Sequence, residues 1–413
     1  MDTGILIVGA GHAGGSAAAL LRQNGYEGAI TLVGEEPLPP YQRPPLSKGW
    51  LKGEVTADDL LLRPAAFYAD KAIALRTATR VQSIAPARRL ATLDTGETIA
   101  YEHLILATGS RLRRLAAPGA DLPGVLELRS AADAERIRAA LRPGARLAVV
   151  GGGYIGLEVA ASARALGAEV TVFEREARLL ARVASPELSE HFAALHRRNG
   201  VQLELGADLA AFEPRDGYVG AVVLRDGRRF DCDVAVVGIG ALANDALASE
   251  AGIACQDGIL VDEFARTSHE GVHAIGDCTR RPVPRYGRTL RLESVPNALE
   301  QAKQAAADLC GKPAPRAEAP WFWSDQYDCR LQIVGMAFDV ARTVVRGDPA
   351  TGKFAVFHLD AACRVQAIEA VNAPQEFVAG RQLVGAAAVL DPERIADPAV
   401  TMKELAAVPG RAQ

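Results

Sequence analysis

Two glycine-rich segments carry the residues whose types and spacing most clearly predict chemistry. Residues 9–14 read GAGHAG and residues 151–156 read GGGYIG, with glycine at the first, third and sixth positions of both. In such a fingerprint the first glycine permits a tight turn and the second lets the backbone approach a pyrophosphate. The third lets the following helix pack closely on the strand. We therefore expect two dinucleotide-binding sites in one chain, built on Gly9, Gly11 and Gly14 and on Gly151, Gly153 and Gly156.

The elements around each fingerprint fit this prediction. Apolar strands are expected at residues 5–8 and 147–150, and helices at about 13–24 and 155–166. The next strand of each unit runs into an acid, Glu35 or Glu174, which could accept a hydrogen bond from a ribose. Two dinucleotides suggest a relay in which a nicotinamide delivers a hydride to a flavin. Glu174 favours NADH because its charge would repel a 2′-phosphate, although Arg175 beside it weakens this preference.

Composition and charge exclude several other classes of protein. The 413-residue chain is long enough for several domains, and its net charge of −4 gives no indication of nucleic-acid or anionic-membrane binding. No run of about 18 apolar residues predicts a membrane span, and the start of the sequence lacks the pattern of a signal peptide. The six cysteines are widely spaced without a CxxC pair, so we expect free thiols and no metal site. A cytoplasmic protein is the simplest interpretation.

Between and after the two fingerprints, two further segments stand out. Residues 35–62 contain five prolines between positions 37 and 45, which argues against a regular helix, and such a long ordered loop is usually functional. The composition changes at residues 313–315, and residues 321–390 read mostly as short strands without a fingerprint. We therefore expect an α/β protein with two Rossmann-like dinucleotide-binding domains and an additional C-terminal domain.

Motifs outside the fingerprints make a family resemblance visible. They are PPLSK at 44–48, ATG at 107–109, GGGYIGLE at 151–158, AIGD at 274–277, ESVPNA at 293–298 and WFWSDQ at 321–326. Together they resemble the FAD-dependent, NADH-using ferredoxin reductases of bacterial oxygenase systems, the family of putidaredoxin reductase, over essentially the whole chain. The resemblance implies a glutathione-reductase-like fold with an FAD domain (1–112 and 242–318), an NADH domain (113–241) and an α+β C-terminal domain (319–413).

The resemblance also implies roles for individual residues. Three of these residues have alternative interpretations. Asp277 could be a simple turn residue, Arg129 could form a surface ion pair, and Trp323 could be a core residue. The residues assigned to FAD are Gly9, Gly11, His12, Ala13, Gly14, Glu35, Arg43, Lys48, Ala107, Thr108, Gly109, Arg129, Gly276, Asp277, Ser294, Val295 and Trp323. Those assigned to NADH are Gly151, Gly153, Tyr154, Ile155, Gly156, Glu174 and Gly240.

Three residues are predicted to take part in catalysis: Lys48, Glu158 and Trp323. If Lys48 and Glu158 both lie near the flavin, they can hold each other charged in a dry site, and the ammonium can stabilise negative charge on the reduced ring. A solvated carboxylate on the second helix is the alternative for Glu158. The family places a tryptophan of the WFWSDQ segment near the flavin, where it would line the path to the electron acceptor.

The stretch 41–48 indicates where the electrons go. Disulfide reductases of the same fold carry a cysteine pair there, whereas this stretch has none, so electrons cannot leave through an internal dithiol. A one-electron acceptor such as a [2Fe–2S] ferredoxin, feeding an oxygenase, is the leading hypothesis. A basic docking face for it is expected at Arg280, Arg281, Arg285, Arg288 and Arg291, with a solvated loop as the alternative. A rubredoxin reductase, an NADH oxidase or peroxide-linked enzyme, and an NADH-sensing flavoprotein remain alternative functions.

Overall fold

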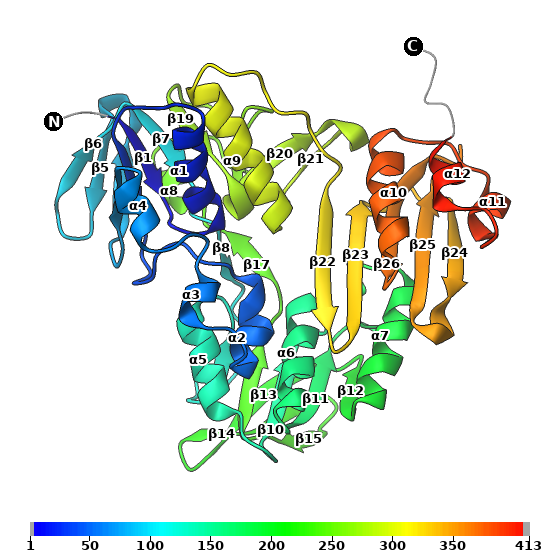
Figure 1. Cartoon of the computed structure of the whole chain (residues 1–413). Coiled ribbons are helices and arrows are strands. Elements are labelled where there is room, and N and C mark those ends of the chain that lie inside the picture. The colour runs from blue at the N-terminus through cyan, green and yellow to red at the C-terminus, as the bar shows by residue number, and fades with distance from the viewer. Residues whose placement is uncertain (1–3, 408–413) are drawn as a thin grey trace. The chain divides into compact units, whose positions relative to one another are not determined.

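The computed structural model describes residues 4–407, which form two compact units (Figure 1). Unit 1 consists of Met1–Gln42, Ala57–Arg111 and Ala241–Pro320. Unit 2 consists of Arg43–Thr56, Leu112–Gly240 and Trp321–Gln413. Each unit is thus assembled from three separate stretches of chain. Residues far apart in sequence can therefore meet within one unit.

Unit 1 is built on a five-stranded parallel sheet that carries the first fingerprint. Its order is β19 (Val272–Ala274), β7 (His103–Leu106), β1 (Ile5–Val8), β2 (Ile30–Val33) and β3 (Ile73–Arg76). Helix α1 (His12–Gln23) connects β1 to β2 and packs beside α9 (Val295–Leu309). The contact surfaces of these two helices are rich in alanine, including Ala17, Ala18, Ala302 and Ala305, all fully buried. Small side chains let the helices lie close together.

Smaller elements complete unit 1. An antiparallel sheet consists of β4 (Val81–Ala85), β5 (Leu90–Leu93) and β6 (Thr98–Ala100). A second small sheet has the order β18 (Ile259–Leu260), β20 (Thr279–Val283) and β21 (Arg288–Leu290). Strands β8 (Ser110–Leu112) and β17 (Ala241–Ala243) pair where the chain changes units. The short helices are α3 (Ala57–Leu60), α4 (Ala66–Asp70) and α8 (Ala246–Glu250).

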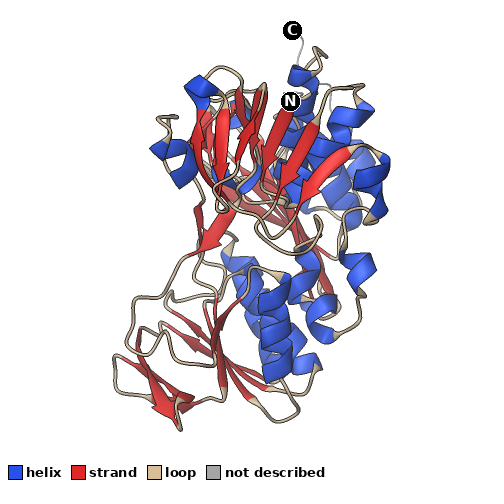
Figure 2. Cartoon of the chain, turned by 90° about the vertical axis from the view of Figure 1, so that its left-hand side faces the viewer, coloured by secondary structure: helices blue, strands red, loops and turns tan. Residues whose placement is uncertain are grey.

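Unit 2 repeats this parallel design around the second fingerprint. The sheet order is β12 (Val201–Leu205), β11 (Glu169–Glu174), β10 (Arg146–Val150), β16 (Val234–Val237) and β9 (Val125–Glu127). Helix α6 (Tyr154–Ala165) connects β10 to β11 and packs against both strands (lower part of Figure 2). The other long helices here are α5 (Ala131–Ala140) and α7 (Pro186–Arg198). An antiparallel sheet adds β13 (Leu209–Arg215), β14 (Tyr218–Leu224) and β15 (Arg229–Asp231).

The C-terminal part of unit 2 is an antiparallel sheet with helices, as predicted. Its order is β22 (Trp321–Gln326), β23 (Cys329–Gly335), β26 (Val365–Val371), β25 (Lys353–Leu359) and β24 (Arg342–Asp348). Helix α10 (Pro374–Gly385) packs on β23 and β26, and α11 (Pro392–Ala396) and α12 (Met402–Ala406) follow. Edge strand β22 also packs against α6. Strand β22 thereby brings its side chains next to the helix of the second fingerprint.

The proline-rich stretch contains more helical structure than predicted. A 3-10 helix, η1 (Pro44–Ser47), and a single helical turn, α2 (Gly49–Lys52), lie inside it and belong to unit 2. Pro44 and Pro45 start η1, where a missing N–H costs nothing, so the prolines begin the helix rather than exclude it. Within the described residues, no helix is long and apolar enough to cross a membrane.

Candidate functional site

The first fingerprint has a backbone that only glycine fits. Gly9 has φ +111°, and a Cβ there would lie 2.1 Å from the Ala107 carbonyl oxygen. A Cβ at Gly14 would lie 1.9 Å from the carbonyl oxygen of Gly9, whereas one at Gly11 would meet nothing within 4 Å. The outer glycines are thus needed for packing, and the middle one faces open space. Gly11 also precedes α1 without a side-chain cap, which fits a pyrophosphate at the helix N-terminus.

The second fingerprint reproduces this geometry in unit 2. Gly151 has φ +113°, and a Cβ there would lie 2.4 Å from the Gly238 carbonyl oxygen. A Cβ at Gly156 would approach the Gly151 carbonyl oxygen to 2.1 Å, and Gly153 again faces open space. Helix α6 starts after Gly153 without a side-chain cap. Both loops therefore fit a dinucleotide by the same test.

The two acids that follow the fingerprints lie in different surroundings. Glu35 is exposed, two residues past the end of β2. Glu174 is the last residue of β11, and its two carboxylate oxygens accept the backbone N–H groups of Gly152 at 2.7 Å and Glu176 at 2.8 Å. Glu174 therefore braces the second glycine loop. Each of its oxygens keeps capacity for a further hydrogen bond, such as one from a ribose hydroxyl.

Unit 1 brings three predicted FAD-binding motifs together at the carboxyl ends of its strands. The Ala107 carbonyl faces Gly9, and Gly276 packs so closely on Ala13 that an added Cβ would lie 3.0 Å from the Ala13 side chain. The Ser110 hydroxyl donates to Asp277 at 3.2 Å. Crevices at this end of parallel strands are the usual ligand sites of such sheets. The ATG and AIGD motifs thus lie beside the first fingerprint.

Other predicted FAD residues have local partners. Thr108 Oγ1 donates to the Asn244 carbonyl oxygen at 2.6 Å, and Gly109 has φ +68°. Ser294 is the N-cap of α9 and accepts the Asn297 N–H at 3.3 Å, so that Val295 begins the helix. His12 is the first residue of α1. Each of these residues lies at a strand end or a helix start.

Several predicted residues of unit 2 lie at the start of α6 or in the 43–56 segment. Arg43 Nη1 donates to the Arg129 carbonyl oxygen at 2.5 Å. The Tyr154 ring packs on Phe322 with centroids 4.6 Å apart, and burial raises the pKa of Tyr154. Ile155 is 47% exposed, so its apolar side chain is open to a ligand at the start of α6. Gly240 has φ +110°.

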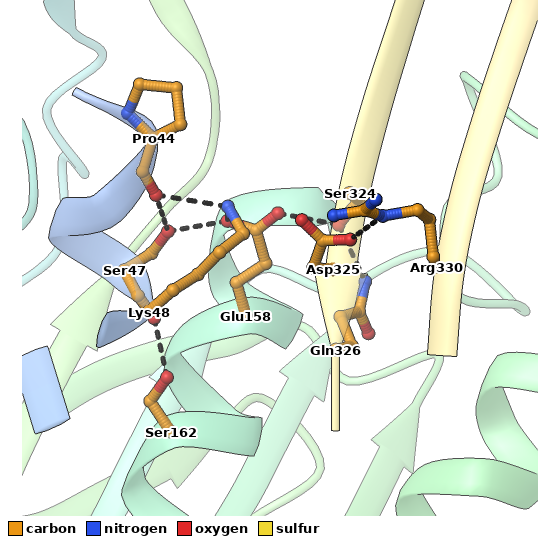
Figure 3. Close-up of polar contacts among 9 residues, drawn as sticks. All are labelled: Pro44, Ser47, Lys48, Glu158, Ser162, Ser324, Asp325, Gln326 and Arg330. Atoms are coloured by element: carbon orange, nitrogen blue, oxygen red, sulfur yellow. Dashed lines mark hydrogen bonds and ion pairs between the residues drawn. The ribbon is translucent and has the colours of Figure 1, made fainter. Parts of the chain in front are cut away.

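Lys48 and Glu158 form an ion pair that is almost fully buried on the carboxylate side (Figure 3). Lys48 Nζ lies 2.6 Å from Glu158 Oε2, and the Lys48 and Glu158 side chains are 19% and 2% exposed. The Ser47 hydroxyl donates to the same oxygen at 2.5 Å, and Ser324 donates to Oε1 at 2.6 Å. The carboxylate is therefore satisfied on both oxygens, as a buried charge requires. A solvated Glu158, the alternative interpretation, is excluded.

Trp323 lies on the opposite face of β22 from Ser324, because side chains alternate along a strand. Its ring is half-buried and packs on Trp321 with centroids 5.5 Å apart. Trp321 in turn contacts Phe377 at 5.5 Å and lies beneath the Arg381 guanidinium. Trp323 thus belongs to an aromatic cluster on the α10 side of the strand.

Two of the five arginines in the predicted basic docking run form ion pairs within the fold, and the docking face itself stays a prediction. Arg281 is 6% exposed and pairs with Glu300 at 3.0 Å, and Arg291 pairs with Glu293. The Arg285 guanidinium lies over the Tyr286 ring at 5.2 Å. The sequence pattern overstated the available charge because it could not show which arginines are neutralised within the fold.

Four residues that contact Glu158 or lie behind it were not predicted from the sequence: Ser47, Ser324, Gln326 and His196. The available signals were that Ser47 belongs to the PPLSK motif and that Ser324 and Gln326 belong to the WFWSDQ motif. His196 carried no signal at all. Among residues 4–407, no group of three or more His, Cys, Asp or Glu side chains is placed to hold a metal ion.

The comparisons with known proteins show the family of the chain. Residues 3–302 match the family described as pyridine nucleotide-disulphide oxidoreductase, and residues 321–406 match the reductase C-terminal family. The chain is 47% identical to the probable ferredoxin reductase CtmF of Castellaniella defragrans, covering 97% of this chain and 98% of the relative. It is 40% identical to a rubredoxin-NAD(+) reductase of Pseudomonas putida, covering 90% and 96%. The crystal structure of the covalent putidaredoxin reductase–putidaredoxin complex matches with TM-score 0.95 and 41% identity, covering 98% of both chains.

This chain belongs to the ferredoxin reductases of the pyridine nucleotide-disulphide oxidoreductase family. Its membership confirms the predicted fold class and the prediction of an oxidoreductase that uses FAD and NAD(H). The six cysteines are free thiols, and burial raises the pKa of Cys329 to about 12 and of Cys232 to about 11. These two thiols stay protonated near neutral pH. Despite the family name, neither is suited to disulfide chemistry.

Proposed function

We propose that this reductase passes electrons from NADH through FAD to a [2Fe–2S] ferredoxin that serves a monooxygenase or dioxygenase. The observation that carries this proposal is the Lys48–Glu158 pair beside a cysteine-free segment, in a chain with two intact fingerprints. When bound, FAD accepts a hydride from NADH and releases the electrons singly to an iron–sulfur protein. We further propose a cytoplasmic location, which fits free cysteines in a reducing compartment.

In unit 1, the first fingerprint holds the pyrophosphate of FAD. The open space at Gly11 admits the phosphates, and the first N–H groups of α1 bind them. Asp277, positioned by Ser110 and by the close packing of Gly276 on Ala13, binds the ribityl–phosphate region. Glu35, two residues past the end of β2, binds the ribose.

In unit 2, the second fingerprint binds NADH. Gly153 leaves room for the pyrophosphate, and Ile155 offers its exposed apolar side chain to the cofactor. Glu174 selects NADH over NADPH, because a 2′-phosphate would meet a carboxylate that is already anchored by two backbone N–H groups. Arg175 is 76% exposed and pairs only loosely with Glu176 at 3.4 Å, so it reduces this discrimination without abolishing it.

Lys48 and Glu158 act together at the flavin. Glu158 holds the ammonium of Lys48 in place, and the carbonyl oxygen of Pro44 accepts a further hydrogen bond from it at 3.1 Å. Lys48 thereby presents a fixed positive charge that favours acceptance of the hydride. Trp323 lines the route by which electrons leave.

A rubredoxin is the second candidate acceptor, because one relative described above is a rubredoxin-NAD(+) reductase with 40% identity. Cytochrome c reduction by NADH, measured with no mediator, with a [2Fe–2S] ferredoxin and with a rubredoxin, separates the two. Stimulation by the ferredoxin alone supports the proposal. Stimulation by the rubredoxin alone would assign the chain to the second function, and stimulation by neither would exclude both.

A further inference from the structure

A continuous chain of buried hydrogen bonds runs from Glu158 into the C-terminal sheet (part of it in Figure 3). Ser324 Oγ lies 2.6 Å from Glu158 Oε1, and Gln326 Nε2 lies 3.2 Å from Ser324 Oγ. Gln326 Oε1 lies 2.8 Å from His196 Nε2, and the Tyr327 hydroxyl lies 3.3 Å from His196 Nδ1. Ser324 and His196 are 0% exposed and Gln326 is 1% exposed.

The direction of every hydrogen bond in this chain follows from the carboxylate at its end. An ionised carboxylate only accepts, so Ser324 must donate its single proton to Glu158. Ser324 must then accept from the Gln326 amide nitrogen, which leaves the amide oxygen of Gln326 facing His196. That oxygen requires a proton on His196 Nε2. His196 Nδ1 is then the acceptor for the Tyr327 hydroxyl. All donors thus point toward Glu158 and polarise one another cooperatively.

The protonation states of the outer residues fit this assignment. Burial lowers the pKa of His196 to about 4, so the ring is neutral near pH 7 and has one donor and one acceptor nitrogen. Burial also raises the pKa of Tyr327, which therefore keeps its proton. A flipped Gln326 amide would offer its oxygen to Ser324 and leave Glu158 Oε1 without a donor. The chain therefore has a single self-consistent arrangement.

Residues on one face of strand β22 and one face of helix α6 repeat at nearly the same distance. The strand can therefore contact the helix at two successive positions. Phe322 packs on Tyr154, and Ser324 contacts Glu158, so two residues along the strand match four along the helix. Both steps span about 6–7 Å. Gln326, the next residue on that face, reaches His196 on α7. One face of β22 therefore contacts both helices.

We infer that Ser324 is a positioning residue for the Lys48–Glu158 pair, with Gln326 and His196 holding Ser324 in its donor orientation. The last torsion of a glutamate side chain is broad, so hydrogen bonds must set the plane of the carboxylate. Ser324 fixes Oε1, which leaves Oε2 for Ser47 and Lys48. The inference rests on the proposed function for its consequence, because it gives the C-terminal sheet a part in orienting the flavin-side ammonium.

The kinetic test compares Ser324→Ala, Ser324→Thr and a matched pair of histidine variants by rapid-mixing reduction of the bound flavin by NADH. Loss of a charge-assisted hydrogen bond is expected to slow the limiting rate about tenfold in Ser324→Ala, with the NADH dissociation constant within about twofold. Ser324→Thr keeps the hydroxyl and should recover most of the rate. His196→Phe should slow reduction, whereas His191→Phe, on the same helix and also buried but outside the chain, should not. An unchanged rate in Ser324→Ala, or equal effects of the two histidine variants, would overturn the inference.

A second readout does not depend on activity. Nitrogen NMR of the histidine rings, with the His196 signals identified by their loss in His196→Phe, should show a proton on Nε2 and none on Nδ1, without titration between pH 5 and 8. The opposite tautomer, or a ring that titrates near pH 6.5, would contradict the chain. Neither measurement involves a ferredoxin, so their outcome is independent of whether the acceptor is assigned correctly.

Discussion

The two glycine fingerprints share one backbone geometry and differ in what surrounds them. In both, the first glycine has φ above +100°, the sixth packs against the carbonyl oxygen of the first, and the third faces open space. The acid of the first is exposed, whereas Glu174 of the second is tied to its own glycine loop through the Gly152 N–H. The glycines therefore explain why both loops can hold a pyrophosphate. The acids and neighbouring side chains must decide which nucleotide each loop holds.

The largest expected effect comes from adding a methyl group to the fingerprints. Gly14→Ala should abolish FAD binding and destabilise unit 1, because its Cβ would lie 1.9 Å from a carbonyl oxygen. Gly156→Ala should abolish NADH binding while the flavin stays bound. Flavin absorption of the purified variants and NADH titration measure the two effects.

The middle glycines provide the control for this comparison. The Cβ added by Gly11→Ala or Gly153→Ala would meet no atom within 4 Å beyond the adjacent residues. Each variant should therefore leave the thermal stability of the apoprotein unchanged and weaken only the binding of the nucleotide at its own loop. If Gly11→Ala bound FAD normally, the open space there would not be the pyrophosphate site.

The second prediction concerns Lys48, because unit 2 is proposed to supply a catalytic charge as well as a nucleotide-binding loop. Lys48→Met should slow flavin reduction by NADH about 10–100-fold, through loss of a charge at the reacting ring. It also leaves Glu158 buried without its cation, which should cost about 3 kcal/mol of stability. The double variant Lys48→Met/Glu158→Gln should regain stability and remain slow. Lys52→Met, which only removes an exposed pair with Glu54, is the matched control. A fast Lys48→Met enzyme would contradict the assigned role.

The third prediction tests the difference between the acids directly. Glu174→Ala should raise the KM for NADH about tenfold and move the NADPH/NADH preference toward NADPH, since a 2′-phosphate then meets Arg175 without the Glu174 carboxylate beside it. Glu35→Ala should leave both nucleotide KM values within about twofold. The ratio of kcat/KM for the two nucleotides is the measurement, and an unaltered ratio in Glu174→Ala would show that selectivity lies elsewhere.

How much of this the sequence could predict depends on the distance between the interacting residues. The βαβ units around Gly9 and Gly151 were predictable because their strand, turn and helix signals are contiguous. The contact between Ser324 and Glu158 was not predictable, because it joins residues 166 positions apart through the packing of edge strand β22 against helix α6. Arg281 looked like a surface charge and is buried beside Glu300, only 19 positions away, because the fold brings β20 and α9 together. Local patterns predict elements, and only the fold shows which polar side chains neutralise one another.

The smallest expected effect extends the comparison to the buried histidines of the two units. Burial lowers the pKa of His196 in unit 2 to about 4 from 6.5, and its side-chain partner Gln326 is neutral. His273 Nε2 in unit 1 forms a hydrogen bond with Asp308 Oδ2 at 2.8 Å. Burial lowers the pKa of His273, and the contact with Asp308 opposes this lowering. Below about pH 6.5 His196 is protonated in the unfolded chain, whereas it stays neutral in the folded protein. The free energy of unfolding should therefore fall as the pH falls from about 6.5 toward 4.

This acid effect has a convenient optical probe, because all three tryptophans, Trp50, Trp321 and Trp323, belong to unit 2. Between pH 6.5 and 5, His196 should account for a loss of unfolding free energy on the order of 1 kcal/mol. Denaturant titrations followed by tryptophan fluorescence should show this loss, and His196→Phe should reduce it. The same pH dependence in both proteins would rule out His196 as its source.

The most direct measurement of the central claim is an anaerobic titration of NADH into the FAD-loaded enzyme mixed with excess oxidised [2Fe–2S] ferredoxin. A hydride carries two electrons and the cluster accepts one, so about two ferredoxins should be reduced for each NADH consumed. Consumption of NADH that reduces the flavin and leaves the ferredoxin oxidised would contradict the account.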